Sequence, residues 1–391
     1  MYFKKVSKII AALFIAAGVF ACTAPTKEEK VKEELKSIME QNKAIGLAVA
    51  VVKDGQVIYT NSLGYKDLEN KIELQDNDIF RIASISKSFT ATGIMQLVEQ
   101  GKINIEGDVS DYIGFKVRNP KYPDVPITIR MLLSHSSSLS DSQGYFTLNV
   151  INPDSSATWQ NAYNDYEPGT KYEYCNLGYN TLGTILEKVS GERFDKYIVS
   201  HILDPLEVYG GYEVASLDST LFVKIYEMLP DSTFKWQPEA YAKRTEEIAN
   251  YRFGYSTPIF SPTGGMKISA RDLAKVMTMH MNYGTGANGA KIIDEQSSRL
   301  MQSNIISPTD EGDAYGFAMR ITEQLIPGLK LTGHTGGAYG VYTSMFFDPE
   351  QKWGIVTMTN GIEYKRENNF VVFQRQVNEC LYNNFIKDAT L

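Results

Sequence analysis

The chain has 391 residues and a formal net charge of −7 at pH 7, and 43% of its residues are hydrophobic. It is longer than one ordinary core requires, so we expect two lobes that share one cleft. The acidic balance argues against nucleic acid as a partner. The four histidines are scattered and only three cysteines are present, so the sequence predicts no metal site and no cofactor.

The first 21 residues predict an export signal. Three lysines form a basic start, and residues 9–20 form an apolar run that is short for a membrane span. The run ends at Cys22 after a small residue, which resembles the cleavage box of bacterial lipoproteins. We therefore expect a mature chain that is lipidated at Cys22 and anchored on the periplasmic or cell-surface side. A plain secretory peptide and an uncleaved anchor are the alternatives.

The next segments predict a tether, a helix and a hairpin. Residues 22–30 are polar and are expected to form a short tether before the folded part. Apolar residues at helical spacing predict an amphipathic helix over 29–42. Two β-rich runs, 45–52 and 56–64, flank Lys53-Asp54-Gly55 and predict a β-hairpin.

The middle of the chain is predicted to be mostly helical. Helical patterns follow Ser84 and recur at 127–134, with Thr128 as the cap, at 177–189 and at 270–283. The segment 204–252 is rich in Tyr and Glu and shows no clear pattern. We expect this segment to form one side of the cleft and to influence substrate specificity.

The last part of the chain returns to strands. Short β-type runs are predicted at 330–334, 341–348 and 353–360, followed by a final helix at 369–384. Strands at both ends with helices between them predict one sheet built from both ends, with an inserted helical lobe. We expect the α/β (α+β) lobe to comprise about 31–85 and 315–391, and the helical lobe about 86–314.

The first candidate for chemistry is Ser84-Ile85-Ser86-Lys87, where a helical pattern begins. A serine needs an adjacent base to act as a nucleophile. Lys87 lies one turn further on, and it serves as that base only if its pKa falls well below ~10.4. The alternative is a capping serine and a solvated lysine. Ser232 and Lys235 repeat the spacing, but no helical pattern follows them, which favours Ser84.

The second candidate is Tyr174-Cys175-Asn176, in a turn-rich segment before a predicted helix. A tyrosine there relays a proton if a cation such as Lys87 lowers its pKa, and Asn176 offers a donor and an acceptor to a peptide-like substrate. The alternative is a buried tyrosine with a bonded hydroxyl. We expect Cys175 and Cys380 to be free, with Cys175 as a small packing residue.

The third candidate is His334-Thr335-Gly336-Gly337, where a short β-type run ends. Glycines there let a backbone approach a ligand closely. A main-chain N–H of this strand would complete an oxyanion hole with the N–H of Ser84. The alternative is a hairpin turn that carries a surface histidine.

These three motifs, in this order, make the chain resemble the serine β-lactamase and penicillin-binding superfamily. The branch it resembles includes class C β-lactamases, D-Ala-D-Ala carboxypeptidases, D-aminopeptidases and esterases. The resemblance runs from about residue 40 to the end and includes FRIASISKSFTATGIM, ITIRMLLSHSSSL and HTGGAYGVYTSMFFDP. It implies a β-lactamase-like sandwich with an antiparallel sheet flanked by helices, plus the inserted helical lobe, with the site between them.

The resemblance also implies the catalytic roles. Ser84 would be the acylated nucleophile. Lys87 and Tyr174 would share its proton, and Tyr174 would help to protonate the leaving group. The N–H groups of Ser84 and Gly337 would form the oxyanion hole.

The substrate-binding residues implied by the resemblance are Asn176, His334, Thr335 and Gly336. Class C β-lactamases usually carry lysine at the position of His334. A histidine with a pKa near ~6.5 is only partly charged at neutral pH, so activity on anionic substrates should fall as pH rises through that pKa. Ser137-Ser138 replaces the usual Ser-Gly, and we expect only a local change of turn there.

The sequence therefore predicts an exported, lipid-anchored, monomeric serine hydrolase with an acyl-enzyme intermediate. Its substrates would be peptides, amides or esters, above all those with a D-residue, such as a cell-wall peptide. A class C-like β-lactamase or an esterase is the alternative within the same chemistry. A β-lactam sensor or peptide-binding protein without turnover is the alternative of a different class.

Overall fold

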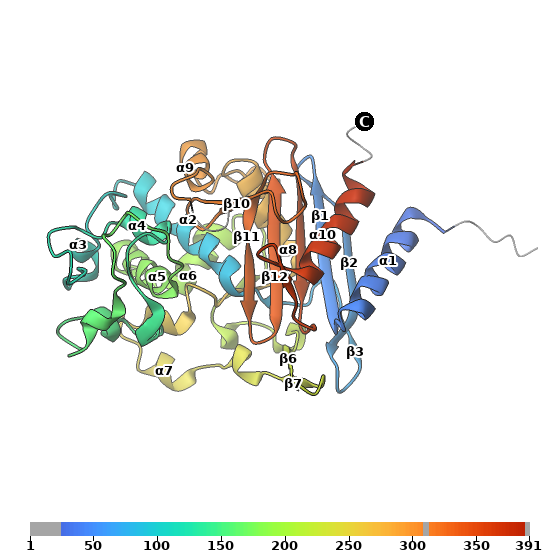
Figure 1. Ribbon diagram of the computed structural model, residues 1–391, viewed down its shortest axis with the longest axis horizontal. Coiled ribbons are helices and arrows are strands. Elements are labelled where there is room, and N and C mark those ends of the chain that lie inside the picture. Colours follow the sequence, from blue (N-terminus) through green and yellow to red (C-terminus); the bar gives the residue numbers. More distant parts are fainter. Residues whose placement is uncertain (1–24, 308–312, 388–391) are drawn as a thin grey trace, which may run out of the picture.

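The computed structural model describes residues 25–307 and 313–387, and its main element is an eight-stranded sheet (Figure 1). The strand order is β3-β2-β1-β13-β12-β11-β10-β9, and all the pairs are antiparallel. The bounds are β1 Gly46–Lys53, β2 Gln56–Asp67, β3 Ile72–Glu73, β9 Ala314–Tyr315, β10 Arg320–Thr322, β11 Leu331–Ala338, β12 Val341–Asp348 and β13 Trp353–Thr359. Since β1 pairs with β13, the prediction of one sheet built from both ends is confirmed.

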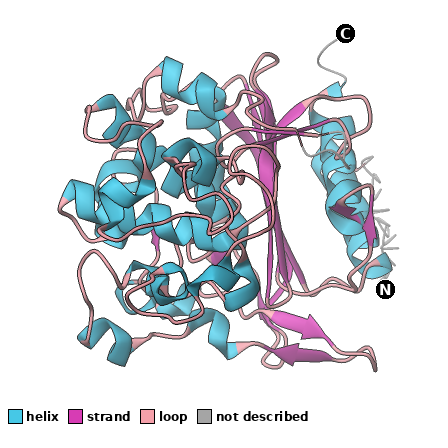
Figure 2. Ribbon diagram, turned by 60° about the vertical axis from the view of Figure 1, so that its left-hand side comes forward, coloured by secondary structure: helices cyan, strands magenta, loops and turns pink. Residues whose placement is uncertain are grey.

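The sheet is covered on both faces, and Figure 2 shows it edge-on between two sets of helices. Alternate side chains of β1 enter two separate hydrophobic cores. Leu47 and its alternate neighbours pack with the helices α1 (Lys27–Gln41) and α10 (Val372–Phe385). Ala48 and its alternate neighbours face the larger core, which continues into the helical lobe. The near-continuous apolar run of this strand is therefore explained by burial on both faces.

The helix α8 (Ala270–Met281) packs directly on the sheet, against β1 and β13. A small residue lets it approach, because a Cβ atom on Gly354 of β13 would lie 2.7 Å from the Met277 side chain. The predicted boundary of the helical lobe, 86–314, is therefore wrong for α8. The helix itself was predicted from its periodicity, and its Ser269 cap is confirmed. Periodicity does not reveal which part of the fold the helix packs against.

The helical lobe lies beside the sheet and contains the remaining helices (Figure 1). They are α2 Ser86–Glu99, α3 Val109–Ile113, α4 Ile129–Leu133, α5 Asn176–Ser190, α6 Phe194–Ile198, α7 Thr245–Ala249 and α9 Glu295–Met301. Three small sheets complete the fold. In the first, the central strand β8 (Lys267–Ile268) pairs with β4 (Phe80–Arg81) on one side and β5 (Gly210–Gly211) on the other. The other two are hairpin-like pairs, β6 (Tyr226–Met228) with β7 (Phe234–Trp236) and β14 (Arg366–Glu367) with β15 (Phe370–Val371).

Two local predictions are confirmed by backbone and cap geometry. Asp54 and Gly55 both have positive φ, 51° and 75°, as a tight two-residue hairpin turn requires. Thr128 caps α4 by accepting a hydrogen bond from the Met131 N–H.

The N-terminal helix begins earlier than expected. Thr26 and Glu29 form a capping box, so α1 starts at Lys27 and the predicted tether of 22–30 is wrong from that residue on. The predicted signal segment of 1–21 and Cys22 lie outside the described residues. Among the residues that the structure does describe, no helix is long and apolar enough to cross a bilayer.

Candidate active site

Ser84 lies in a short 3₁₀ turn, Ala83–Ile85, that leads from β4 into α2. Ala83 adopts a left-handed conformation with φ of 48°, which is unusual for a residue with a side chain. Hydrogen bonds hold the turn on both sides: Ile82 N–H donates to Met266 O at 3.0 Å, and Thr343 Oγ1 donates to Ile82 O at 2.9 Å. The Ser84 side chain caps neither helical turn, so the capping alternative is wrong.

Lys87 is fully buried, and its Nζ meets three oxygen atoms. The distances are 3.1 Å to Ser84 Oγ, 2.9 Å to Asn176 Oδ1 and 3.0 Å to Thr263 O. Burial lowers the pKa of Lys87 to about 7, although the nearby Asp141 carboxylate opposes this shift. The solvated-lysine alternative is therefore wrong, and the amine has the pKa of a general base at neutral pH.

Tyr174 lies over the amine, with Lys87 Nζ 4.7 Å from its ring centroid. Burial raises the pKa of Tyr174 well above its usual range, and a hydrogen bond with Ser84 opposes this shift only in part. The expectation of a lowered pKa is wrong, because desolvation outweighs the hydrogen bond with Ser84. Tyr174 therefore keeps its proton and is suited to donate it.

Asn176 begins α5 and is held by Asp141. The Asp141 carboxylate accepts from Asn176 N at 3.0 Å, from Asn176 Nδ2 at 2.8 Å and from Leu177 N at 2.9 Å. The amide oxygen of Asn176 meets Lys87 Nζ and also accepts from Thr263 Oγ1 at 2.8 Å. Asn176 Nδ2 has two hydrogens, so one donor remains for a substrate.

Asp141 and Thr263 are site residues that the sequence reasoning missed. Asp141 is 35 residues from Asn176, and Thr263 is 176 residues from Lys87. No spacing pattern links residues so far apart. A third missed residue, His135, accepts from Cys175 N–H through Nδ1 at 3.1 Å, and its ring centroid lies 4.3 Å from that of Tyr174.

His334 lies within β11, four residues before the strand ends, so the surface-turn alternative is wrong. The turn comes later, at Tyr339 and Gly340, which have positive φ. The His334 side chain is 6% exposed, and its Nε2 lies 3.0 Å from the Tyr315 hydroxyl. Burial, reinforced by Lys87, lowers the pKa of His334 to about 3. The expected pH dependence through a pKa near ~6.5 is therefore wrong: this ring is neutral at neutral pH.

Gly336 allows the turn that carries Ser84 to lie against β11. A Cβ atom there would lie 2.2 Å from Ile82 O and 2.4 Å from Thr343 Oγ1, so no other residue fits without displacement of the turn. A Cβ on Gly337 would meet nothing closer than 3.5 Å. Beyond Gly333, no described strand pairs with the outer edge of β11. Thr335 and Gly337 therefore belong to an open strand edge beside Ser84.

Two further sequence predictions are tested by backbone geometry. Ser138, where the family usually has glycine, has φ of 63°, and its hydroxyl accepts from Asn119 Nδ2 at 2.9 Å. The turn thus keeps a glycine-like conformation with a serine. Ser232 is exposed, with φ of 65°, in the turn between β6 and β7. Cys175 and Cys380 are free and buried, as expected.

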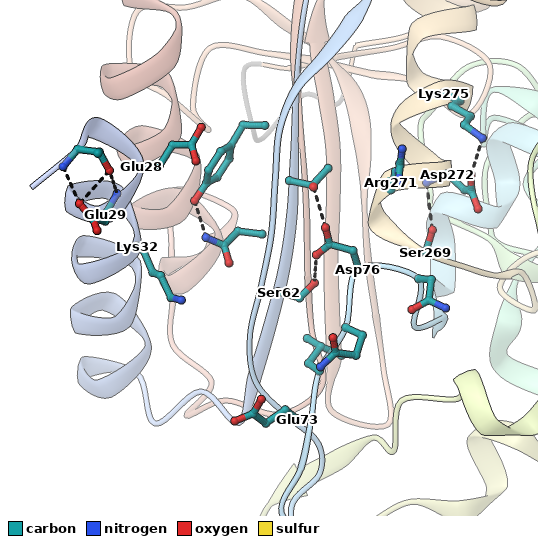
Figure 3. A pocket seen from close by; sticks show the side chains of 17 residues that line it. Glu28, Glu29, Lys32, Ser62, Glu73, Asp76, Ser269, Arg271, Asp272 and Lys275 are labelled. Atoms are coloured by element: carbon teal, nitrogen blue, oxygen red, sulfur yellow. Dashed lines mark hydrogen bonds and ion pairs between the residues drawn. The ribbon is translucent and has the colours of Figure 1, made fainter.

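A wide pocket of about 1150 Å³ lies elsewhere, between α1, β2 and α8 (Figure 3). Its charged side chains come from α1 and α8 and from the segment after β2, where Asp76 accepts hydrogen bonds from Thr60 and Ser62. None of the predicted site residues lines it. Volume alone therefore does not identify the reactive centre, which is defined by the buried amine beside Ser84.

Comparison with known proteins agrees with this fold. The model of the family described as Beta-lactamase matches residues 31–371, so the chain belongs to this family. Protein flp of Staphylococcus aureus (strain N315) is 23% identical over 353 residues, which cover 85% of this chain and 63% of that protein. The chain thus spans less than two thirds of the length of this curated relative.

Solved structures show the same fold. The octameric penicillin-binding protein homologue from Pyrococcus abyssi matches with a TM-score of 0.71 and 26% identity, covering 92% of this chain and 77% of that one. D-amino acid amidase from Ochrobactrum anthropi SV3 matches with a TM-score of 0.71 and 21% identity, covering 93% and 100%. The β-lactamase-like fold expected from the sequence is confirmed.

Proposed function

We propose that the chain is a serine hydrolase in which Ser84 is acylated and Lys87 is the general base. The observation that carries this proposal is the buried Lys87 Nζ, 3.1 Å from Ser84 Oγ and with a pKa of about 7. An amine in that state accepts the serine proton at neutral pH without a large energetic cost.

Acylation then proceeds through three proton transfers. The neutral amine takes the proton of Ser84 while Oγ bonds to the substrate carbonyl carbon, and the resulting oxyanion is held by the N–H groups of Ser84 and Gly337. The carbonyl–nitrogen or carbonyl–oxygen bond breaks as Tyr174 donates its proton to the leaving group. Lys87 returns a proton to Tyr174, and both residues regain their starting states.

Deacylation uses the same groups in reverse. Water attacks the acyl carbon and gives a proton to Lys87. The bond between the acyl carbon and Ser84 Oγ then breaks, and Lys87 returns the proton to Oγ. The acid product is released and the free serine is restored. Asp141 and Thr263 act on Asn176, and Asn176 in turn holds the amine toward Ser84.

We further propose peptides, amides or esters with a D-residue as substrates. The fold shared with a D-amino acid amidase and a penicillin-binding protein homologue supports this class. The neutral His334 supports amides and esters over substrates with a carboxylate at that end of the cleft. Turnover of D-Ala-D-Ala peptides, D-aminoacyl amides, short esters and a cephalosporin tests the proposal. Labelling of Ser84 without turnover of any of them would favour a sensor instead.

A prediction concerns Asp141, which touches no reacting atom. Asp141→Asn keeps the shape but loses one of the two carboxylate acceptors, so Asn176 and Lys87 are expected to be misplaced and acylation to slow about 10- to 100-fold. The rate of labelling by a fluorophosphonate measures this effect. Asp154→Asn, at an exposed aspartate of the same lobe, serves as the control and should label at the unaltered rate. A normal rate in Asp141→Asn would remove the positioning role.

The N-terminal predictions also become proposals: an exported, monomeric chain attached to the membrane through lipidated Cys22. Export and lipidation are supported by the sequence of residues 1–22. Metabolic labelling with a fatty acid in a bacterial host is expected to mark the full-length chain and to be lost in Cys22→Ser. Equal labelling of the two chains would leave Cys22 without this role.

A further inference from the structure

A small pocket beside the Ser84 turn is lined by basic side chains from segments far apart in the sequence. Arg81 comes from β4, Lys267 from β8, and Arg244 directly precedes α7. Arg81 and Lys267 are partners directly opposite each other in the antiparallel pairing of β4 with β8. Residues in such a pair point to the same face, and two positive charges there repel each other.

The bonding partners of these two cations are neutral. Arg81 donates from Nε to Gly264 O at 3.0 Å and from Nη1 to Ala240 O at 3.3 Å. Lys267, which is 4% exposed, donates from Nζ to Tyr212 O at 2.6 Å. Within the described residues, neither cation forms an ion pair with a carboxylate. Buried charges are normally paired, so this pair lacks an anion.

The carboxylates near the pocket do not supply that anion. Glu213 is already bound to Arg193 at 2.6 Å and to Lys196 at 3.0 Å. Glu239 is exposed, and Arg244 pairs with Glu247 at 3.3 Å in a partly exposed bridge of little energetic weight. Burial lowers the pKa of Arg81, and burial together with Arg81 and Arg244 lowers the pKa of Lys267 well below its usual range. A bound anion would reverse these shifts.

The pocket and the catalytic amine are linked through two neighbouring residues of one segment. Thr263 O accepts from Lys87 Nζ, and the next carbonyl, Gly264 O, accepts from Arg81 Nε. The Arg81 guanidinium also lies under the ring of Tyr339, 5.1 Å from its centroid. Tyr339 follows β11, so the open edge of that strand leads from His334 at one end to Arg81 at the other.

These positions fix which part of a substrate would reach the pocket. In the proposed mechanism the leaving group departs beside Tyr174, whose ring centroid lies 6.3 Å from that of His334. The acyl part must then extend the other way along β11, past Gly337 toward Tyr339 and Arg81.

We propose that Arg81, with Lys267 and Arg244, binds a carboxylate in the acyl part of the substrate. The inference rests on the proposed function and deepens it, because it assigns negative charge to the acyl side. It also gives a role to the segment 204–252, which contributes Arg244 together with one carbonyl acceptor of Arg81, Ala240 O, and the acceptor of Lys267, Tyr212 O.

Two p-nitrophenyl esters of equal chain length test the proposal: the hemiglutarate, which carries a carboxylate, and the valerate, which does not. We expect the unaltered protein to show a higher kcat/KM for the hemiglutarate. Arg81→Gln is expected to lower that value about 10- to 100-fold and to change the value for the valerate less than about threefold. Arg244→Gln, at a partly exposed position, should show the same selective loss to a smaller extent.

A binding measurement separates this proposal from the proposed function. Glutarate is expected to raise the Tm of the Ser84→Ala protein, and to raise it less when Arg81→Gln or Arg244→Gln is added. Arg366→Gln, at an exposed arginine, is the matched control and should keep both the preference and the shift. Hydrolysis of both esters without a preference, or a Tm shift that survives both substitutions, would overturn the anion site alone. Absence of any hydrolysis and of any Ser84 labelling would overturn the proposed function, while a glutarate shift that depends on Arg81 would still support the site.

Discussion

Replacement of Ser84 by alanine is expected to lower turnover about 10⁴-fold or more and to abolish covalent labelling by a fluorescent penicillin or a fluorophosphonate. The proposed reaction forms its acyl bond through Ser84 Oγ, and among the described residues no other hydroxyl forms a hydrogen bond with Lys87 Nζ. The substitution removes the oxygen atom of one partly exposed residue and leaves the turn between β4 and α2 intact. Ser84→Ala should therefore fold normally and fail only in chemistry.

Ser232→Ala is the matched control, because Ser232 and Lys235 repeat the spacing of Ser84 and Lys87. Ser232 is exposed in a hairpin turn, and its hydroxyl contacts only Lys43 Nζ, at 3.4 Å, among the described side chains. This variant should label and turn over substrate like the unaltered protein. Loss of labelling in Ser232→Ala, together with labelling of Ser84→Ala, would show that the nucleophile has been misassigned.

The contrast between Ser84 and Ser232 shows how little a four-residue motif says about chemical reactivity. The spacing Ser-x-x-Lys was equal in both, and only the helical pattern after Lys87 separated them. The structure adds what decides the chemistry: full burial of one amine against the exposure of the other. Burial depends on tertiary packing, which a four-residue pattern does not encode.

More of the fold than of the candidate site could be predicted from the sequence. The strands at both chain ends and the longer helices follow from local periodicity, and the pairing of β1 with β13 follows from the burial of both. The packing of α8 on the sheet was missed, because an amphipathic helix fits either lobe equally well. The start of α1 at Lys27 was missed because the capping box of Thr26 and Glu29 was counted as a polar tether.

The electrostatics of the site could not be predicted from residue types. The sequence placed Lys87, Tyr174 and His334 in one cleft but assigned the wrong state to two of them. Tyr174 was expected to have a lowered pKa and His334 an ordinary one, whereas burial raises the first and lowers the second to about 3. Desolvation is the largest cause of both shifts, and its size depends on the surrounding packing.

The acylation rate is expected to rise about tenfold per pH unit below pH 7 and to level off above it. Lys87 acts as a base only when neutral, and burial lowers its pKa to about 7. Raising the pH removes its proton, so the active fraction grows until the amine is fully neutral. Because the pKa of His334 is about 3, its titration should cause no second change in the acylation rate between pH 5 and 8.

Replacement of Lys87 by arginine tests the same point by removing the titration. A guanidinium stays charged across the accessible pH range and accepts no proton, so acylation should fall about 10²- to 10⁴-fold and lose its step near pH 7. Lys235→Arg, at the exposed lysine of the second motif, is the matched control and should keep the step. Single-turnover labelling over pH 5 to 9 measures both variants. A step near pH 7 that persists in Lys87→Arg would assign the base to another group.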